Sequence, residues 1–248
     1  VKRVIAEMGG KNAIIVDDDA DLDEAVVGVL QSAFGYAGQK CSALSRLIVL
    51  GDVHDELLPR LKEGVASLEI APSTDPGCQV PPVIDEEARK KVLSYIEIGA
   101  AEGRLLARVD PTEGLARRGT FVPVAVFESI RPSHRLAREE VFGPVHAVLR
   151  ARDWEDALRI ANDTEYALTG GVHSRTMAHL DDARRRMRCG NLYLNRGITG
   201  AIVDRHPFGG FAMSGVGAKT GGPDYLKQFL VARACSENLM RHGFAPID

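Results

Sequence analysis

The feature that most constrains the fold of this chain is an alternation of short apolar runs with segments of helical periodicity. Apolar runs of strand length occupy residues 12–16, 46–50, 104–107, 121–127, 145–149, 170–172 and 191–194. Apolar residues recur every three to four positions in residues 22–34, 52–68, 85–101, 154–161 and 176–187, which predicts helices there. The alternation predicts right-handed βαβ crossovers and an α/β fold: an open, mostly parallel twisted sheet with helices on both faces.

Three local features qualify this prediction. Asp17, Asp19 and Asp21 begin like a calcium loop, but Leu22 and Gly28 stand where that loop needs glycine and glutamate, so helix capping is preferred. A proline at position 59 is expected to end or kink the helix over residues 52–68. Residues 110–118 are the most turn-like insertion, too short to form a domain boundary.

Composition excludes several classes of protein. The 31 basic and 34 acidic side chains give a formal net charge of −3, which argues against a nucleic-acid binder. No apolar run approaches the roughly 20 residues that span a bilayer. The four cysteines form no CxxC pair and the histidines show no metal-ligand spacing, so no metal site is expected and a reducing cytoplasm is the expected compartment.

Two phosphate-binding motifs are considered and rejected. No GxGxxG follows a predicted strand, so the chain is expected to lack a complete dinucleotide-binding half. Residues 217–220, GAKT, look like the end of a phosphate loop. Ala218 stands where that loop needs glycine, however, and the segment does not follow a strand.

Cys41 is the first candidate for chemistry. It lies in the sequence GYAGQKCSA, residues 35–43, just beyond a predicted helix end and among small residues that let a ligand approach the backbone. Lys40 beside it is expected to favour the nucleophilic thiolate. Taken alone, a single cysteine is more often a small buried apolar residue, and that interpretation stays open.

Three other loop segments strengthen the case for a site. Residues 7–11 read EMGGK, residues 139–144 read EEVFGP, and residues 207–210 read PFGG, followed by Ser214 and Gly215. All of them, like Cys41, lie at ends of predicted strands, where open α/β sheets bind ligands.

In this order the four segments resemble the motifs E-(L/M)-G-G-K, G-Q-x-C, E-x-F-G-P and P-F-G-G-x-x-x-S-G of the aldehyde dehydrogenase superfamily. The resemblance covers nearly the whole chain and corresponds to the C-terminal, catalytic half of that family. It implies a catalytic domain over residues 1–229 and a tail over residues 230–248 that contributes to homo-oligomerisation. The start without methionine, inside an apolar stretch, suggests a piece of a longer protein. The implied cofactor, NAD or NADP, would be held mainly by an N-terminal domain outside this chain.

Finer motifs are similar to those of the 1-pyrroline-5-carboxylate dehydrogenase family. These are Ser42 after the cysteine, NRGITGA at residues 195–201 and GGPDYL at residues 221–226. That family oxidises L-glutamate γ-semialdehyde to L-glutamate in proline catabolism, alone or fused to proline dehydrogenase. The resemblance implies that Ser42, Gly200 and Ala201 hold the α-carboxylate of the substrate and that Phe208 packs against its aliphatic part.

The resemblance also implies the catalytic roles. Cys41 would attack the aldehyde to form a thiohemiacetal, and after oxidation Glu7 would activate the water that hydrolyses the thioester. Glu140 would bind the ribose hydroxyls next to the nicotinamide, and Phe142 would pack beside the ring. The amide of Cys41 would be one oxyanion donor, and an asparagine of the other half the second.

Other functions remain open at this point. The substrate could be another small aldehyde, or Cys41 could serve a thiol hydrolase or acyltransferase, which would need a histidine base. The chain could also be a non-catalytic domain that keeps only the fold. Considered singly, Glu7 and Glu140 are ordinary solvated acids and Phe142 an ordinary core residue. On its own, the chain is expected to have little or no dehydrogenase activity.

Overall fold

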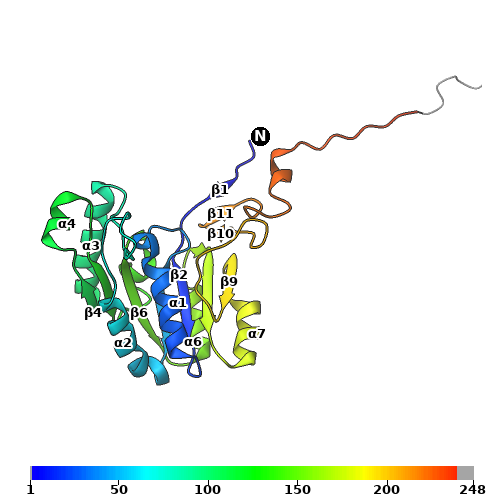
Figure 1. Ribbon diagram of the computed structural model, residues 1–248. Coiled ribbons are helices and arrows are strands. Elements are labelled where there is room, and N and C mark those ends of the chain that lie inside the picture. The colour runs from blue at the N-terminus through cyan, green and yellow to red at the C-terminus, as the bar shows by residue number, and fades with distance from the viewer. Residues whose placement is uncertain (1, 239–248) are drawn as a thin grey trace, which may run out of the picture.

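A seven-stranded sheet forms the centre of the protein, seen in a computed structural model that describes residues 2–238 (Figure 1). From one edge to the other, its strands are β4 (Arg104–Val109), β5 (Val124–Glu128), β6 (Val145–Ala151), β3 (Leu44–Leu50), β2 (Asn12–Val16), β8 (Thr169–His173) and β9 (Asn191–Leu194). Strand β4 runs antiparallel to β5, and every other neighbouring pair is parallel. This confirms the predicted mostly parallel sheet.

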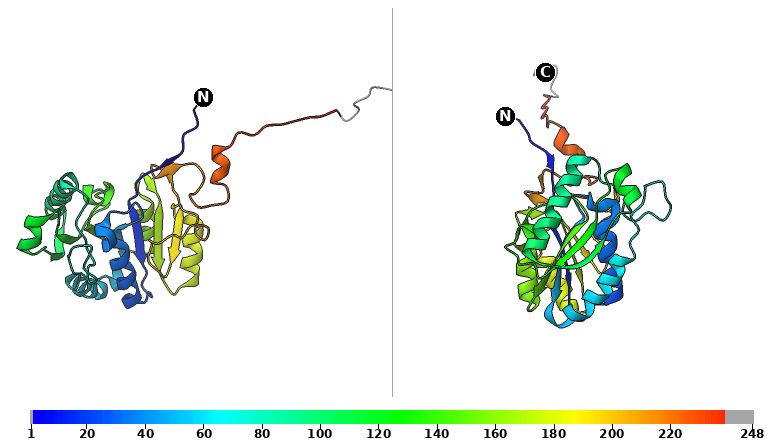
Figure 2. Two further views of the ribbon diagram at one scale, coloured as in Figure 1. Left: turned by 45° about the horizontal axis from the view of Figure 1, so that its top comes forward. Right: turned by 90° about the vertical axis from the view of Figure 1, so that its left-hand side faces the viewer.

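Helices cover both faces of the sheet (Figure 2). They are α1 (Leu22–Phe34), α2 (Gly51–Ala66), α3 (Glu86–Glu102), α4 (Glu113–Arg118), α5 (Arg135–Arg138), α6 (Trp154–Asn162) and α7 (Met177–Arg186), with 3₁₀ turns η1 (Gly35–Gly38) and η2 (Leu226–Phe229). Helix α1 packs against α2, and α6 packs against α7 and the central strands β2, β3 and β6. All five side chains of β2 are buried, as expected for a strand covered on both faces.

Aspartate side chains cap the helices α1, α3 and α6, and the acidic cluster at residues 17–21 predicted the first of these caps. Asp21 accepts a hydrogen bond from the amide of Glu24 at the start of α1, at 3.2 Å. Asp85 caps α3 at 2.8 Å, and Asp153 caps α6 at 2.8 Å. Each cap satisfies an amide that has no partner within the helix and places a negative charge at the positive end of the helix dipole.

Two predictions about irregular segments need correction: the helix does not end at Pro59, and residues 110–118 are not all turn. Pro59 lies inside α2, which continues to Ala66. The helix continues because Leu57 and Leu61 on either side of the proline are buried in the core, and this packing offsets one lost backbone hydrogen bond. The insertion at residues 110–118 contains helix α4, capped by Thr112 at its start.

Two short antiparallel ribbons lie beyond the amino ends of the parallel strands, near β10 and β11 at the top of Figure 1. Strand β1 (Ala6–Glu7) pairs with β11 (Gly215–Val216), and β7 (Tyr166–Ala167) pairs with β10 (Phe211–Ala212). The ribbon of β1 and β11 ties the first residues of the chain to residues 207–220, the late glycine-rich loop, and fixes the backbone of Glu7.

The remaining described segments are simple. Residues 230–238 form neither helix nor strand and are exposed, and the rest of the predicted tail, residues 239–248, lies outside the described residues. Within residues 2–238, no helix combines the length and the apolar character needed to cross a bilayer.

Candidate active site

Three of the four predicted loop segments meet at the amino ends of β2, β3 and β6. A narrow cavity of about 20 Å³ is lined by the loops that contain Gly10, Lys40 and Glu140. The carbonyl oxygen of Cys41 lies so close to Gly10 that a Cβ built there would approach it to 2.7 Å. The site therefore lies at the amino ends of the strands, whereas most open α/β sheets bind ligands at the carboxyl ends.

Asn12, the first residue of β2, holds the cysteine loop in place. Its side-chain amide donates to the carbonyl oxygens of Cys41 at 2.7 Å and of Ala43 at 2.8 Å. Its side-chain oxygen accepts from the amide of Thr169 on β8 at 2.9 Å. One buried amide thus fixes the loop to two strands. Sequence reasoning missed Asn12, although it directly follows the GGK motif.

A left-handed turn precedes the cysteine loop. Tyr36, Ala37 and Gly38 have φ angles of 58°, 54° and 69°, a region that costs non-glycine residues free energy. At Gly38 a Cβ would also lie 2.5 Å from the carbonyl oxygen of Gly143. Glycine is therefore required at position 38 on two counts, and its absent side chain lets the cysteine loop pack against the loop that carries Glu140.

The thiol of Cys41 is half-buried. Burial raises its pKa above the ordinary value, the amide of Ser42 opposes this shift, and the negative charges of Glu140 and Glu7 raise the pKa further. The Lys40 ammonium instead lies over the ring of Tyr36, 4.2 Å from its centroid. The charged groups that act most strongly on the thiol are therefore carboxylates, which is the opposite of the effect expected from Lys40.

Glu7 points toward the late glycine-rich loop. It is exposed on β1, and its Oε1 accepts a hydrogen bond from the hydroxyl of Thr220 at 2.6 Å. A Cβ built on Gly209 would lie 3.7 Å from the same oxygen. Thr220 belongs to the GAKT segment that was rejected as a phosphate loop, and sequence reasoning gave it no role.

Glu140 and Phe142 flank the cysteine loop on the other side. The Oε1 atom of Glu140 accepts from the amide of Gly10 at 2.9 Å, and its carboxylate lies where a Cβ on Gly9 would be. Phe142 has φ of 58° and leaves 41% of its surface exposed. A carboxylate held by one oxygen beside an exposed aromatic ring fits the ribose and the flat ring of a nicotinamide nucleotide.

The residues expected to bind substrate are only partly brought together. Ser42 is buried, and its carbonyl oxygen accepts from the hydroxyl of Thr169 at 3.2 Å. Gly200 adopts φ of 87° with open space around it. Within residues 2–238, no hydrogen bond joins Gly200 or Ala201 to Ser42.

Phe208 is linked to Glu7 through Thr220. The backbone amide and carbonyl groups of Phe208 exchange hydrogen bonds with those of Thr220, at 2.9 and 2.7 Å. The late glycine-rich loop therefore carries Phe208, which was predicted to contact the aliphatic part of the substrate, and Thr220, which hydrogen-bonds the carboxylate of Glu7.

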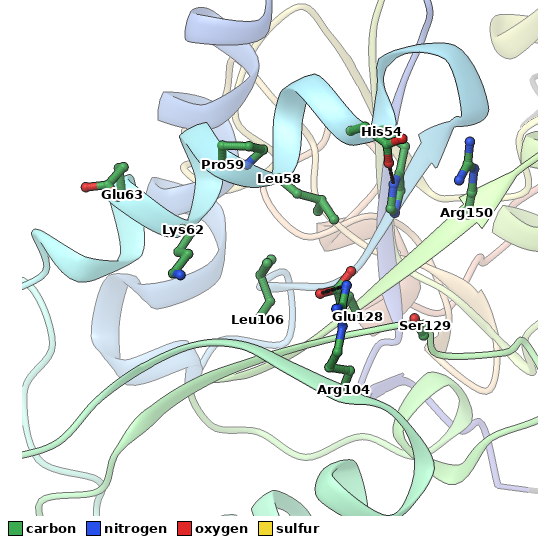
Figure 3. Close-up of a pocket in the computed structure, with 11 residues that line it drawn as sticks. His54, Leu58, Pro59, Lys62, Glu63, Arg104, Leu106, Glu128, Ser129 and Arg150 are labelled. Atoms are coloured by element: carbon green, nitrogen blue, oxygen red, sulfur yellow. Dashed lines mark hydrogen bonds and ion pairs between the residues drawn. The ribbon is translucent and has the colours of Figure 1, made fainter.

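A second, wider cleft, whose lining side chains Figure 3 shows, lies at the other end of the sheet. It measures about 620 Å³ and opens between α2 and the carboxyl ends of β5 and β6. Two pairs form among its charged groups: His54 with Asp55 at 2.9 Å and Arg104 with Glu128 at 2.8 Å. Arg150 donates to the backbone carbonyl of residue 51 at 3.0 Å. Much of the polar lining is thus paired within the protein, and the cleft is remote from the cysteine.

No histidine in the described part of the chain hydrogen-bonds the thiol of Cys41. His146 is buried against the ring of Phe34, and burial lowers its pKa to about 3, so it is a neutral core residue. A thiol hydrolase would need a histidine that contacts the sulfur, and the structure therefore does not favour that alternative.

The mostly parallel sheet, with glycine-rich loops around a half-buried thiol at its amino end, forms an α/β domain with a candidate cysteine nucleophile. The model of the aldehyde dehydrogenase family matches residues 1–235, and the chain belongs to that family.

Relatives and solved structures agree with this assignment. The chain is 50% identical to a protein of Geobacillus kaustophilus and 48% identical to one of Bacillus subtilis, both named 1-pyrroline-5-carboxylate dehydrogenase. Each match covers 96% of this chain and 45% of the relative, so the chain spans about half the length of these relatives.

Among solved structures, the proline utilization A protein of Bdellovibrio bacteriovorus matches with a TM-score of 0.94 and 53% identity, over 100% of this chain and 26% of that one. A 1-pyrroline-5-carboxylate dehydrogenase from Thermus with bound NAD matches with a TM-score of 0.86 and 48% identity, over 92% of this chain and 43% of that one.

Proposed function

We propose that this chain is the catalytic half of an NAD-dependent or NADP-dependent aldehyde dehydrogenase that oxidises L-glutamate γ-semialdehyde to L-glutamate in proline catabolism. The names of the similar proteins support the substrate. The observation that carries the proposal is the joining of the Cys41, Glu140 and Glu7 segments through Gly10 and the late glycine-rich loop. These groups are what a thioester mechanism requires in one place.

Cys41 is the proposed nucleophile. Its sulfur bonds to the aldehyde carbon, and the carbonyl oxygen becomes an oxyanion. The amides of Ser42 and of Cys41 itself act on the sulfur and are close enough to stabilise negative charge there. Because burial and two carboxylates favour the neutral thiol, the half-exposed sulfur must give up its proton to solvent water as it attacks.

Glu7 is the proposed base for hydrolysis. The negative charge of its exposed carboxylate raises the pKa of the Cys41 thiol, which supports a role near the acyl group of a thioester. It would take a proton from water as the water oxygen bonds to the thioester carbon, and the carbon–sulfur bond would then break.

Glu140 and Phe142 are the proposed cofactor contacts in this half. Glu140 offers a free carboxylate oxygen to ribose hydroxyls, and the exposed ring of Phe142 offers an apolar surface to the nicotinamide. A bound nicotinamide would supply the hydride acceptor that oxidation of the thiohemiacetal requires. Most of the remaining nucleotide contacts belong to a separate N-terminal domain.

The proposed substrate contacts are Ser42, Gly200, Ala201 and Phe208. A hydroxyl and closely spaced backbone amides suit a carboxylate, since together they form an anion-binding nest. The left-handed φ of Gly200 turns the chain sharply at this point. Phe208 would pack against the aliphatic part of the substrate.

We further propose that residues 1–229 form the catalytic domain and that the tail from residue 230 joins copies of the protein into a homo-oligomer in a reducing cytoplasm. Leu226, Phe229, Leu230 and Val231 expose most of their apolar surface, which supports an interaction there. All four cysteines are free, which supports a reducing compartment.

An assay of aldehyde oxidation tests the proposal. The protein at its full natural length is expected to reduce NAD or NADP with L-glutamate γ-semialdehyde, and this chain alone is expected to do so little or not at all. Ester hydrolysis without oxidation would favour a thiol hydrolase. Silence of the full-length protein toward every small aldehyde would favour a non-catalytic domain.

A further inference from the structure

The GAKT segment, which the sequence offers no reason to place in the site, contacts it directly. Thr220 donates its hydroxyl hydrogen to Oε1 of Glu7 at 2.6 Å, across 213 positions of sequence. This is a charge-assisted hydrogen bond, stronger than one between neutral groups. It leaves Oε2 of Glu7 available to accept a proton.

Lys219 fixes the segment from which Thr220 reaches Glu7. Its ammonium donates to the carbonyl oxygens of Gly190 and Gly209, the latter at 3.1 Å, and to the side-chain oxygen of Asn191 at 3.1 Å. Together with the backbone pair between Phe208 and Thr220, these bonds hold the loop rigidly against the first residue of β9. Thr220 is thus a fixed donor facing a flexible carboxylate.

Glu7 needs such a donor because the pairing of β1 fixes only its backbone and leaves its side chain exposed. It is exposed and stands on a strand of only two residues, with three rotatable side-chain bonds. A general base works only when it lies within hydrogen-bond reach of the water it deprotonates. A carboxylate that explores many rotamers would meet that condition for a small fraction of the time.

We propose that Thr220 is a positioning residue: its hydroxyl holds one oxygen of Glu7 so that the other faces the water that hydrolyses the thioester on Cys41. This inference rests on the proposed function. In the step concerned, the water oxygen bonds to the acyl carbon and its proton passes to Glu7. The carbon–sulfur bond breaks, the sulfur leaves as thiolate, and the acid product is released.

Ester hydrolysis tests the proposal without any nucleotide. With p-nitrophenyl acetate, the full-length protein is expected to release a burst of p-nitrophenolate as Cys41 is acetylated, followed by a slower steady state set by thioester hydrolysis. Thr220→Val is expected to keep the burst and to lower the steady-state rate about ten-fold, the scale of a hydrogen bond to a charged group. Thr220→Ser keeps the hydroxyl and is expected to stay within about two-fold of the unaltered protein.

The outcomes separate this proposal from the function on which it rests. If the unaltered protein gives no burst and no aldehyde oxidation, both fail. If it gives both and Thr220→Val hydrolyses the acetyl-enzyme at the unaltered rate, the positioning role alone is overturned. A fall in burst rate and steady-state rate together, or a Thr220→Ser variant as slow as Thr220→Val, would indicate a merely structural role and would also overturn it.

Discussion

The two ends of the central sheet differ in how their buried charged groups are paired. At the carboxyl end, Asp17 is fully buried and accepts hydrogen bonds at 2.6 Å from Ser174 and from the ring of His179. Asp19 there accepts from the amide of Arg175 at 2.9 Å. The carboxylates of this loop are therefore paired, although Nε2 of His173, at the end of β8, is buried without a hydrogen-bond partner among the described residues.

At the amino end, the loops around Cys41 contain left-handed backbone and a buried charge without a partner. Phe142 and the turn at residues 36–38 adopt left-handed conformations, and the ammonium of Lys11 is buried with no hydrogen-bond partner among the described residues. Such features cost stability and persist where function needs them. The comparison teaches that the candidate site lies beside a buried ammonium that the fold leaves unpaired, although the opposite end has the larger cleft.

Removal of the thiol should have the largest effect. Cys41→Ala is expected to lower aldehyde oxidation by about 10⁴-fold, because no other group can form the covalent intermediate. Circular dichroism should show an unchanged fold. Cys235→Ala, which alters an exposed cysteine in the tail, is the matched control and should keep full activity. Near-normal activity of Cys41→Ala would show that the reaction does not take place at the amino end of the sheet.

The buried Lys11 should make the amino end sensitive to pH. Burial, followed by the charge of Arg46, lowers the pKa of Lys11 from 10.5 to about 7. Between these values the unfolded chain binds more protons than the folded one, so stability rises as the pH rises from 7 to 10.5. The cost at pH 7 is on the order of 4 kcal/mol.

Lys11→Met is therefore expected to be the more stable protein at pH 7 and to lose this part of the pH dependence. Urea unfolding at several pH values measures it. Lys62→Met, at the rim of the carboxyl-end cleft, is the control and should leave the pH dependence as it is. An unchanged pH slope in Lys11→Met would show that the lysine is not the source of the instability.

Glu7→Gln should separate the two halves of the reaction. The first turnover is expected to remain fast, while steady-state turnover falls about 100-fold, because only hydrolysis of the thioester needs the base. Rapid-quench measurement of product in the first turnover checks this. Equal loss in both phases would assign Glu7 to the attack step instead.

The smallest predicted effect concerns the turn before Cys41. Gly38→Ala is expected to lower the free energy of unfolding by about 2 kcal/mol, because a side chain there is strained and overlaps Gly143. Gly35→Ala is the matched control: its φ is −54° with open space around it, so a change within about 0.5 kcal/mol is expected. Equal changes in the two variants would contradict the description of a strained amino end.

Much of the fold follows from local patterns in the sequence. The apolar run at β2, the helix after Asp21 and the strand β9 were predicted with the boundaries that the structure shows, because caps and periodicity act over a few residues. The pairing of the two-residue strands β1 and β11 was not predicted, and the strand expected within residues 1–6 reaches only Ala6 and Glu7 among the described residues. Ala6 pairs with Val216, and no local pattern encodes a pairing over such a distance.

The candidate site shows the same division between features that local sequence encodes and features that depend on residues far apart in the sequence. Cys41, Glu7 and Glu140 stand in glycine-rich motifs that local spacing makes visible, and the structure joins their segments. Asn12 and Thr220 were missed, because each acts through a partner far away in the sequence. The expected effect of Lys40 on the Cys41 thiol was wrong for a similar reason. Lys40 is adjacent to Cys41 in the sequence, but its ammonium lies over the ring of Tyr36.

Peptide mapping by mass spectrometry, after acid quenching during turnover, tests the central claim most directly. In the full-length protein supplied with cofactor and L-glutamate γ-semialdehyde, the glutamyl thioester is expected on the peptide that contains Cys41, and it should accumulate further in Glu7→Gln. An adduct on Cys78, Cys189 or Cys235, or turnover with every cysteine unmodified, would contradict it.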